Sequence, residues 1–321
     1  MNANRREFLK TGAGAFALAA LNGCCCGKCC RGEGPCSCFN GVTIGAITYS
    51  YRSMPLKPYA ILDYAVESGI ETLELMGNHL ECDAGYVPSA NPGRDDKAGQ
   101  AKVREELRAW RLAQPMSVFE KVRAAYEARG VKIHIVKFWD VGAASVSDAE
   151  MDYYFKAARA MGATAITREV ISQDKKTLDA LGARLAAYAD KHAFHVAFHN
   201  HTQINAKTYD GPLLGLSPNF MINYDIGHYV AANDDDAVEF VRRRFDRIES
   251  VHVKDRTTKA HGSKNLMWGK GDTPLARLFA CMQEMKAKFP ADVELEYAIP
   301  AGSNAVKEVA RCADYSRSII S

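Results

Sequence analysis

Hydrophobic and polar positions alternate in a repeating order along most of the chain. From Val42 onward, short runs rich in apolar and β-branched residues are followed by longer stretches in which apolar residues recur every three or four positions. The first pattern is typical of a buried strand and the second of an amphipathic helix. Their regular alternation predicts βα units built around a parallel sheet.

Eight runs fit the strand pattern, and helical patterns separate them. The expected strands are residues 42–49, 71–75, 132–138, 165–167, 195–198, a run ending at 220–222, 248–253 and 293–297. The expected helices are residues 58–68, 101–112, 117–129, 147–161, 177–192, 234–244, 273–288 and 305–320, with a short helix or turn at 209–216. This order predicts a (β/α)₈ TIM barrel over residues 42–321. An open doubly wound sheet is the competing fold, but no glycine-rich phosphate loop follows the first strand.

Polar side chains follow the later strands at the points where those strands end. The four strand ends read His199-Asn200-His201, Asp225-Ile226-Gly227-His228, His252-Val253-Lys254-Asp255 and Glu294-Leu295-Glu296-Tyr297. Because the carboxyl ends of barrel strands meet at one rim, we expect these residues to form a single site.

One residue from each of these four ends makes a plausible metal-ligand set. We expect the ligands to be His199, Asp225, His252 and Glu296. Imidazole and carboxylate ligands without cysteine suit Mn²⁺, Co²⁺, Zn²⁺ or Mg²⁺. An ion that holds a carbonyl and a neighbouring hydroxyl polarises the adjacent C–H bond, and a base beside it can then move the proton.

The remaining polar residues at the strand ends are candidates for proton transfer and substrate binding. The predicted acid, base and electrophilic groups are Glu169, His201, His228 and Lys254. The predicted substrate contacts are Glu74, His79, Lys137 and Trp268, with Trp139 as a second ring that could stack on a sugar. Two alternatives stay open: His201 and His228 could only orient other groups by hydrogen bonds, and the tryptophans could only be packed.

The N-terminal region does not follow the βα pattern. Arg5-Arg6 and the mildly apolar residues 11–21 predict a twin-arginine signal peptide over residues 1–23, because the apolar run is shorter than the ~20 residues that span a bilayer. The residues before Cys24 resemble a lipoprotein processing box, so Cys24 is a candidate for acylation. This predicts export to the periplasm or cell envelope, with contact to the membrane only through that lipid.

A cysteine-rich segment follows the predicted signal. Seven of the ten cysteines fall within residues 24–41, among several glycines, and we predict a flexible tether there. Its thiols could form disulfides, carry lipid or bind a soft metal.

The charge balance narrows the choice of partner. The formal net charge is +3, and the 41 Lys and Arg residues are scattered along the chain. This does not favour nucleic acid. A small carbohydrate is the expected partner, and an oligomer is compatible with the sequence.

The strand-end motifs, together with Trp268-Gly269-Lys270-Gly271-Asp272, resemble those of the sugar phosphate isomerase/epimerase family, the xylose-isomerase-like barrels. The resemblance covers residues 42–321. In that family an Asp, a His and a Glu from the sixth, seventh and eighth strands bind a divalent metal, which implies Asp225, His252 and Glu296 here. Glu294 lies on the same face of the last strand as Glu296, so the assignment could be off by two residues.

The fifth strand departs from the commonest family pattern. Many relatives place there a Glu that is both ligand and base, whereas this chain has His199, as in an exported branch with the His-Asn-His pattern. The difference favours an imidazole as ligand or base, as in relatives that eliminate or isomerise keto-sugars.

The sequence therefore predicts a divalent-metal-dependent isomerase or epimerase, or a lyase, that acts on a small sugar or keto-sugar. The first alternative is a non-catalytic sugar-binding lipoprotein on the same barrel, which would bind sugar in the presence of a chelator. The second is a phosphodiesterase of the endonuclease IV kind, which would need more metal-binding residues and a basic groove.

Overall fold

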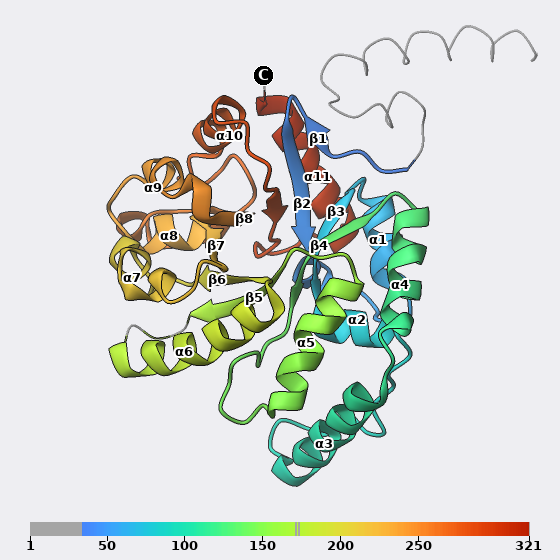
Figure 1. Cartoon of the computed structure of the whole chain (residues 1–321). Helices are drawn as coiled ribbons and strands as arrows, with labels where there is room; N and C mark the ends of the chain where they lie inside the picture. Colours follow the sequence, from blue (N-terminus) through green and yellow to red (C-terminus); the bar gives the residue numbers. More distant parts are fainter. Residues whose placement is uncertain (1–33, 171, 173, 321) are drawn as a thin grey trace, which may run out of the picture.

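Eight parallel strands close into a barrel in the structure, a computed structural model that describes residues 34–170, 172 and 174–320 (Figure 1). The strands follow one another around the barrel in sequence order, from β2 through β8 and then β11. The barrel closes where β11 pairs in parallel with β2, with Ala291 opposite Ile44 and Val293 opposite Ala46. The prediction of a (β/α)₈ barrel is confirmed.

The strands and helices have the following bounds. The strands are β1 Cys38–Phe39, β2 Val42–Ile47, β3 Thr72–Met76, β4 Lys132–Lys137, β5 Ala165–Val170, β6 His195–Asn200, β7 Phe220–Asp225, β8 Ile248–Val253, β9 Asp255–Arg256, β10 Asn265–Leu266 and β11 Ala291–Val293. The α-helices are α1 Ala60–Glu67, α2 Gly77–Asp83, α3 Lys97–Ala113, α4 Ser117–Ala128, α5 Asp148–Ala160, α6 Lys175–His192, α7 Ala206–Asp210, α8 Ile226–Ala232, α9 Ala237–Arg243, α10 Leu275–Glu284 and α11 Ala305–Ile319. Short 3₁₀ helices are η2 Thr48–Tyr51, η3 Pro212–Gly215, η4 Phe245–Arg247 and η5 Lys259–His261.

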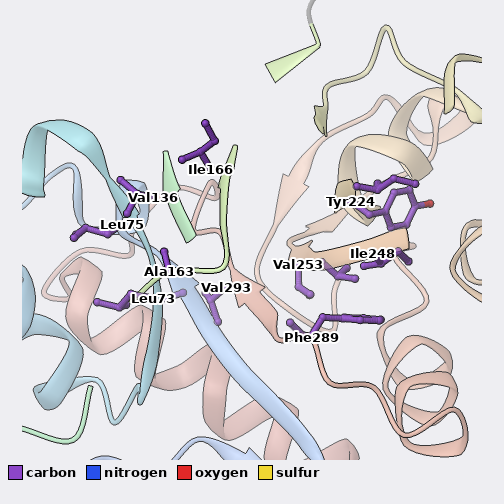
Figure 2. Close-up of a cluster of buried hydrophobic side chains, with 14 of the residues drawn as sticks. Leu73, Leu75, Val136, Ala163, Ile166, Tyr224, Ile248, Val253, Phe289 and Val293 are labelled. Atoms are coloured by element: carbon purple, nitrogen blue, oxygen red, sulfur yellow. The ribbon is translucent and has the colours of Figure 1, made fainter. Parts of the chain in front are cut away.

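The apolar core lies mainly between the barrel wall and the surrounding helices. Alternate residues of each strand point outward and join helix side chains in one buried cluster. Figure 2 shows part of this cluster, with Leu73 and Leu75 of β3 and Val253 of β8 among the labelled side chains. The other residues of the same strands point into the barrel. These inward positions are polar toward the carboxyl ends of the strands, which is where the candidate site lies.

Four elements differ from the sequence prediction near that rim. The last strand, β11, ends at Val293, so Glu294 and Glu296 follow the strand instead of belonging to it. The strand β5 is longer than expected and includes Glu169. Two short helices, α2 and α8, begin directly after β3 and β7 and were not predicted as helices.

The end of the predicted tether is packed on the barrel. Residues Cys38 and Phe39 form β1, which pairs antiparallel with the start of β2. Ser37 is fully buried and donates to the Ile44 carbonyl, and Cys36 is disulfide-bonded. The prediction of a tether up to residue 41 is therefore wrong for these last residues. The predicted signal peptide, Cys24 and the remaining tether cysteines lie outside the described residues.

None of the helices between residues 34 and 320 that the structure describes is both long and apolar enough to cross a membrane.

Candidate metal and substrate site

A group of four buried side chains lies at the carboxyl rim of the barrel. His199 is the penultimate residue of β6, Asp225 ends β7, His252 comes from β8, and Glu294 follows β11. Each offers one ligand atom, and these atoms all lie within 4.8 Å of one another. The strand-eight carboxylate in this group is Glu294, whereas the sequence prediction favoured Glu296. Strand alternation could not separate the two glutamates, because residues two positions apart lie on the same face. In the structure β11 ends at Val293, and Glu294, directly after it, is the one that joins the group.

The spacing of these atoms fits a divalent ion. Ligand atoms about 2.1 Å from a metal are separated by about 3.0 Å when they are at right angles and about 4.2 Å when they are opposite. His252 Nδ1 lies 2.9 Å from Glu294 Oε2, and His199 Nε2 lies 3.9 Å from Asp225 Oδ2. Asp225 Oδ2 is buried, and the Lys254 ammonium lies 2.9 Å from it. A buried anionic oxygen needs a cation beside it, and an ammonium group or a metal ion can fill that position.

Asn223 fixes which nitrogen of His199 is available. The Glu74 carboxylate only accepts hydrogen bonds, so the Asn223 amide group must turn its Nδ2 toward Glu74 Oε2, at 2.7 Å. The Asn223 Oδ1 then accepts from His199 Nδ1, at 2.6 Å. The proton of the neutral imidazole is thereby held on Nδ1, and the lone pair of Nε2 faces Asp225. Sequence reasoning missed Asn223, although its position two residues before Asp225 places it on the same inward face.

Glu74 lies deeper than predicted. It is fully buried, and its other oxygen accepts from Thr167 Oγ1 at 2.9 Å. Burial by itself raises the pKa of Glu74, but the nearby His252 outweighs this effect, so the pKa ends below its usual value. Glu74 therefore supports Asn223 and His252 from below instead of lying on the open rim as a substrate contact.

His252 lies between two carboxylates. Its Nε2 is 2.7 Å from Glu74 Oε2, and its Nδ1 is 2.9 Å from Glu294 Oε2. Burial lowers the pKa of His252, but Glu74 and Glu294 outweigh it and raise the pKa to about 10. Without a metal, the ring is an imidazolium that donates from both nitrogens. A metal bound at one nitrogen would take the place of one proton.

Asn200 joins the ends of two neighbouring strands. Its Nδ2 donates to the Asp225 carbonyl at 2.9 Å, and its Oδ1 accepts from the Asp225 backbone N–H at 2.8 Å. Asp225 Oδ1 in turn accepts from the His228 N–H at 2.7 Å and caps the first turn of α8. The His-Asn-His and Asp-x-x-His motifs are thus linked by hydrogen bonds that hold Asp225 Oδ2 toward the other ligands.

Lys254 is buried among the acidic groups of the site. Its Nζ donates to Glu296 Oε2 at 2.8 Å and lies 2.9 Å from both Asp225 Oδ2 and Glu294 Oε2. Burial lowers the pKa of Lys254, but these three carboxylates outweigh burial and raise it above its usual value. Lys254 therefore carries a positive charge in the centre of the site.

His228 lies between two cations. Lys254 Nζ is 3.0 Å from its Nε2, and Arg256 is 2.6 Å from its Nδ1. Only one of these contacts can be a hydrogen bond to the ring, because a neutral imidazole carries a proton on its other nitrogen. Burial, together with Lys254, lowers the pKa of His228 to about 3. His228 is therefore a neutral ring and a weak base, which argues against its predicted role in proton abstraction.

His201 is the most accessible imidazole of the site, with 38% of its side chain exposed. Its ring stacks on that of His228, with centroids 4.8 Å apart, and its Nε2 lies 3.6 Å from Glu169 Oε1. Burial raises the pKa of Glu169, but His201 and Lys137 outweigh it and lower the pKa to about 2. Glu169 is thus an ionised group that orients His201. Of the two stacked histidines, His201 is better placed for proton transfer than the buried His228.

A cleft of about 280 Å³ lies over the ends of β2, β3 and β4, and its lining does not include the four candidate ligands. It is linked to His201 through Trp139, Lys137 and Glu169, since Lys137 Nζ lies 2.8 Å from Glu169 Oε1. Trp139 is 52% exposed, lies 5.1 Å above Lys137 Nζ and meets Tyr49 edge to face. His79 also lines the cleft and its Nδ1 lies 2.9 Å from Thr48 Oγ1. Of the two tryptophans predicted to stack on a sugar, Trp139 is the one that lies open. Trp268 is 8% exposed and packs against Tyr315.

A closed parallel barrel with histidines and carboxylates on the carboxyl rim is the architecture of the TIM-barrel class. Residues 62–315 match the family model described as xylose isomerase-like TIM barrel, and the chain belongs to that family. None of the curated proteins compared with this chain is a significant match in sequence.

Several solved structures share the fold. A probable 3-DHS dehydratase from Bacillus anthracis has a TM-score of 0.60 at 14% identity, over 85% of this chain and 98% of its own. A sugar phosphate isomerase/epimerase from Parabacteroides distasonis has a TM-score of 0.59 at 14% identity, over 88% and 96% of the two chains. A 3-keto-D-glucoside 4-epimerase from E. coli has a TM-score of 0.56 at 15% identity, over 86% and 99%.

Proposed function

We propose that the protein is a divalent-metal-dependent isomerase or epimerase, or a lyase, that acts on a small sugar or keto-sugar. The observation that carries this proposal is the buried cluster of His199, Asp225, His252 and Glu294, whose ligand atoms all lie within 4.8 Å of one another. Support also comes from the structural neighbours, which are named as a dehydratase and as epimerases of sugars.

The four ligand residues would hold the ion, and Mn²⁺, Co²⁺, Zn²⁺ and Mg²⁺ suit their donor atoms. The bound ion supplies positive charge that polarises a carbonyl group and a neighbouring hydroxyl of the substrate.

The proton chemistry is assigned to His201. Glu169 faces Nε2 of His201, so the neutral ring carries its proton on Nε2 and Glu169 keeps the ring in place. The basic nitrogen is then Nδ1, which takes the proton from the carbon next to the carbonyl. A proton delivered to the other face of the same carbon gives epimerisation, and a proton delivered to the neighbouring carbon gives isomerisation. Loss of a hydroxyl group instead gives elimination.

The cleft is assigned to the sugar ring. Trp139 presents its exposed face beside Tyr49, and an indole face packs well against the C–H groups of a sugar. His79 and Asn78 line the same cleft and can hydrogen-bond to hydroxyl groups. Lys137, beneath Trp139, adds a positive charge near the substrate oxygens.

Exchange of substrate protons with solvent tests this function. Metal-loaded protein is incubated in D₂O with a panel of keto-sugars, and deuterium incorporation next to the carbonyl is followed by NMR. We expect exchange that a chelator abolishes and that His201→Ala lowers by about 100-fold or more. His195→Ala, at the other end of the same strand, is the matched control and should retain exchange. Sugar binding without any exchange would favour the non-catalytic binding protein.

We also propose that the protein works in the periplasm or cell envelope. The Arg5-Arg6 motif supports this proposal, and a lipid on Cys24 would attach the chain to the membrane. Fractionation of cells that express the full chain or the Arg5→Lys/Arg6→Lys variant tests it. The variant should remain in the cytoplasm.

A further inference from the structure

The ammonium group of Lys254 lies on the same oxygens that the proposed metal needs. Its Nζ is 2.9 Å from Asp225 Oδ2 and 2.9 Å from Glu294 Oε2, and both residues belong to the ligand group. We propose that the Lys254 ammonium and the divalent ion compete for Asp225 and Glu294, and that Glu296 draws the ammonium away when the ion binds. This inference rests on the metal site proposed above.

Competition follows from charge and space. Lys254 is 1% exposed, so water screens little of the repulsion between its ammonium group and a neighbouring dication. Its aliphatic stem runs beside Gly227, where a Cβ atom would lie 2.3 Å from Lys254 Cγ. The stem is therefore confined, and the end of the side chain is the part that can move. Without the ion, the ammonium group compensates the charge of two buried carboxylates.

Glu296 offers the ammonium group a second position. Its Oε2 accepts from Lys254 Nζ at 2.8 Å, and 22% of the Glu296 side chain is exposed, against 7% for Glu294. Glu296 is absent from the ligand group of described residues, so it can pair with Lys254 without giving up a metal contact. This arrangement gives each of the two glutamates after β11 its own role: Glu294 binds the ion, and Glu296 pairs with the Lys254 ammonium group.

Two single substitutions should change metal affinity in opposite directions. Lys254→Met removes the competitor and should strengthen Mn²⁺ binding by about tenfold or more. Glu296→Gln removes the alternative position for the ammonium group and should weaken Mn²⁺ binding several-fold. In the double variant there is no ammonium group to draw away, so its affinity should equal that of Lys254→Met.

The experiment is a titration of chelator-stripped protein with Mn²⁺ by calorimetry, for wild type, both single variants and the double variant. Lys132→Met, at the opposite end of the barrel, is the control for loss of a lysine charge and should bind as wild type does. Far-UV circular dichroism checks that each variant is folded. If Lys254→Met does not fold without metal, the weaker binding of Glu296→Gln remains the required result.

Three outcomes would overturn the inference. An unchanged or weaker affinity in Lys254→Met shows that the lysine does not compete. If Glu296→Gln weakens Mn²⁺ binding as much in the Lys254→Met background as it does in the wild type, Glu296 is itself a ligand. In both cases the metal site stands. If neither wild type nor Lys254→Met binds Mn²⁺ or another divalent ion, the metal site of the proposed function fails together with the inference.

Discussion

At the scale of single residues, Asn223 decides whether His199 can bind a metal. Two of its side-chain hydrogen bonds, from Nδ2 to Glu74 and from His199 Nδ1 to Oδ1, fix the imidazole tautomer. Asn223→Ala should therefore lower Mn²⁺ affinity by about 10- to 100-fold, which is the usual cost of losing a group that orients a ligand. Calorimetric titration measures it. Asn219→Ala, near the start of β7, is the control, and equal affinities in the two variants would refute the role of Asn223.

Asp83 is a second residue with a measurable consequence, this time for stability. Its carboxylate accepts from Tyr126 OH at 2.6 Å and from the Tyr59 N–H, and burial raises its pKa from 3.8 to about 6. The folded protein thus holds this proton more tightly than the unfolded chain. Protonated Asp83 favours folding, and its contribution is lost as the pH rises from about 4 through about 6.

The variant Asp83→Asn isolates this effect. A shift of about two pKa units corresponds to at most about 3 kcal/mol. The free energy of unfolding of Asp83→Asn minus that of wild type should therefore be larger at pH 8 than at pH 4 by up to that amount, because only the wild type loses stability as the carboxyl group ionises. Urea denaturation at both pH values measures it. The control is Asp314→Asn, on the exposed face of α11, whose stability relative to wild type should be the same at both pH values. The same result for Asp83→Asn would show that burial does not destabilise the ionised Asp83 carboxylate.

Site residues could be predicted from the sequence where they lie on a regular strand. His199, Asp225 and His252 lie in the last residues of regular strands, so the sequence was sufficient to propose them as one group. The register shift between β7 and β8 lies earlier in β8, before Ser250. Glu294 and Glu296 lie beyond β11, where tertiary contacts replace the alternation. There the Leu295 N–H donates to Ser50 Oγ, and Arg52 donates to the Leu295 carbonyl. Contacts between residues some 245 positions apart cannot be read from local periodicity.

At the scale of elements, the start of α8 is pressed against the end of β8. Gly227 is the second residue of α8, and a Cβ atom there would lie 2.8 Å from the Lys254 carbonyl oxygen. Gly227→Ala should therefore destabilise the protein by about 1–3 kcal/mol, since a backbone atom has to move. Denaturant unfolding measures this loss. Gly215→Ala in η3 is the matched control, because open space surrounds that position. Equal stability of both variants would show that α8 can shift without cost.

The barrel elements were predictable because their patterns are local. The strand β8 has the bounds that its apolar run predicted, and α5 begins after the capping box of Ser147 and Glu150. The helices α2 and α8 were missed because each starts directly after a strand, without an intervening loop. In α8 the N-cap is Asp225, a residue whose chemistry had already suggested a ligand. Asp225 is therefore both the N-cap of α8 and a candidate ligand, and the sequence pattern indicated only the ligand.

At the scale of the whole molecule, metal binding should stabilise the fold. The four ligand residues come from β6, β7, β8 and the segment after β11, which an unfolded chain does not hold together. At a free Mn²⁺ concentration of 100 times Kd, the free energy of unfolding should rise by about 2.7 kcal/mol. Asp225→Asn keeps an oxygen to cap α8 but loses the charged ligand, so it should show little of this gain. Denaturation of wild type and of Asp225→Asn, each with and without Mn²⁺, measures the two increases in the free energy of unfolding. An increase as large in the variant as in wild type would exclude Asp225 as a ligand.

The closure of the barrel between β2 and β11 also has a consequence for synthesis of the chain. The two strands are separated by about 250 residues, so on a ribosome that adds about 5–20 residues per second β2 is complete roughly 10–50 s before its partner emerges. The strand β1 pairs with Val42 and Thr43 on the opposite side of β2, so it does not cover the edge that waits for β11. Residues 44–46, which β11 later covers, are left with an open edge, and this edge is where a nascent chain would meet a chaperone or a second copy of itself.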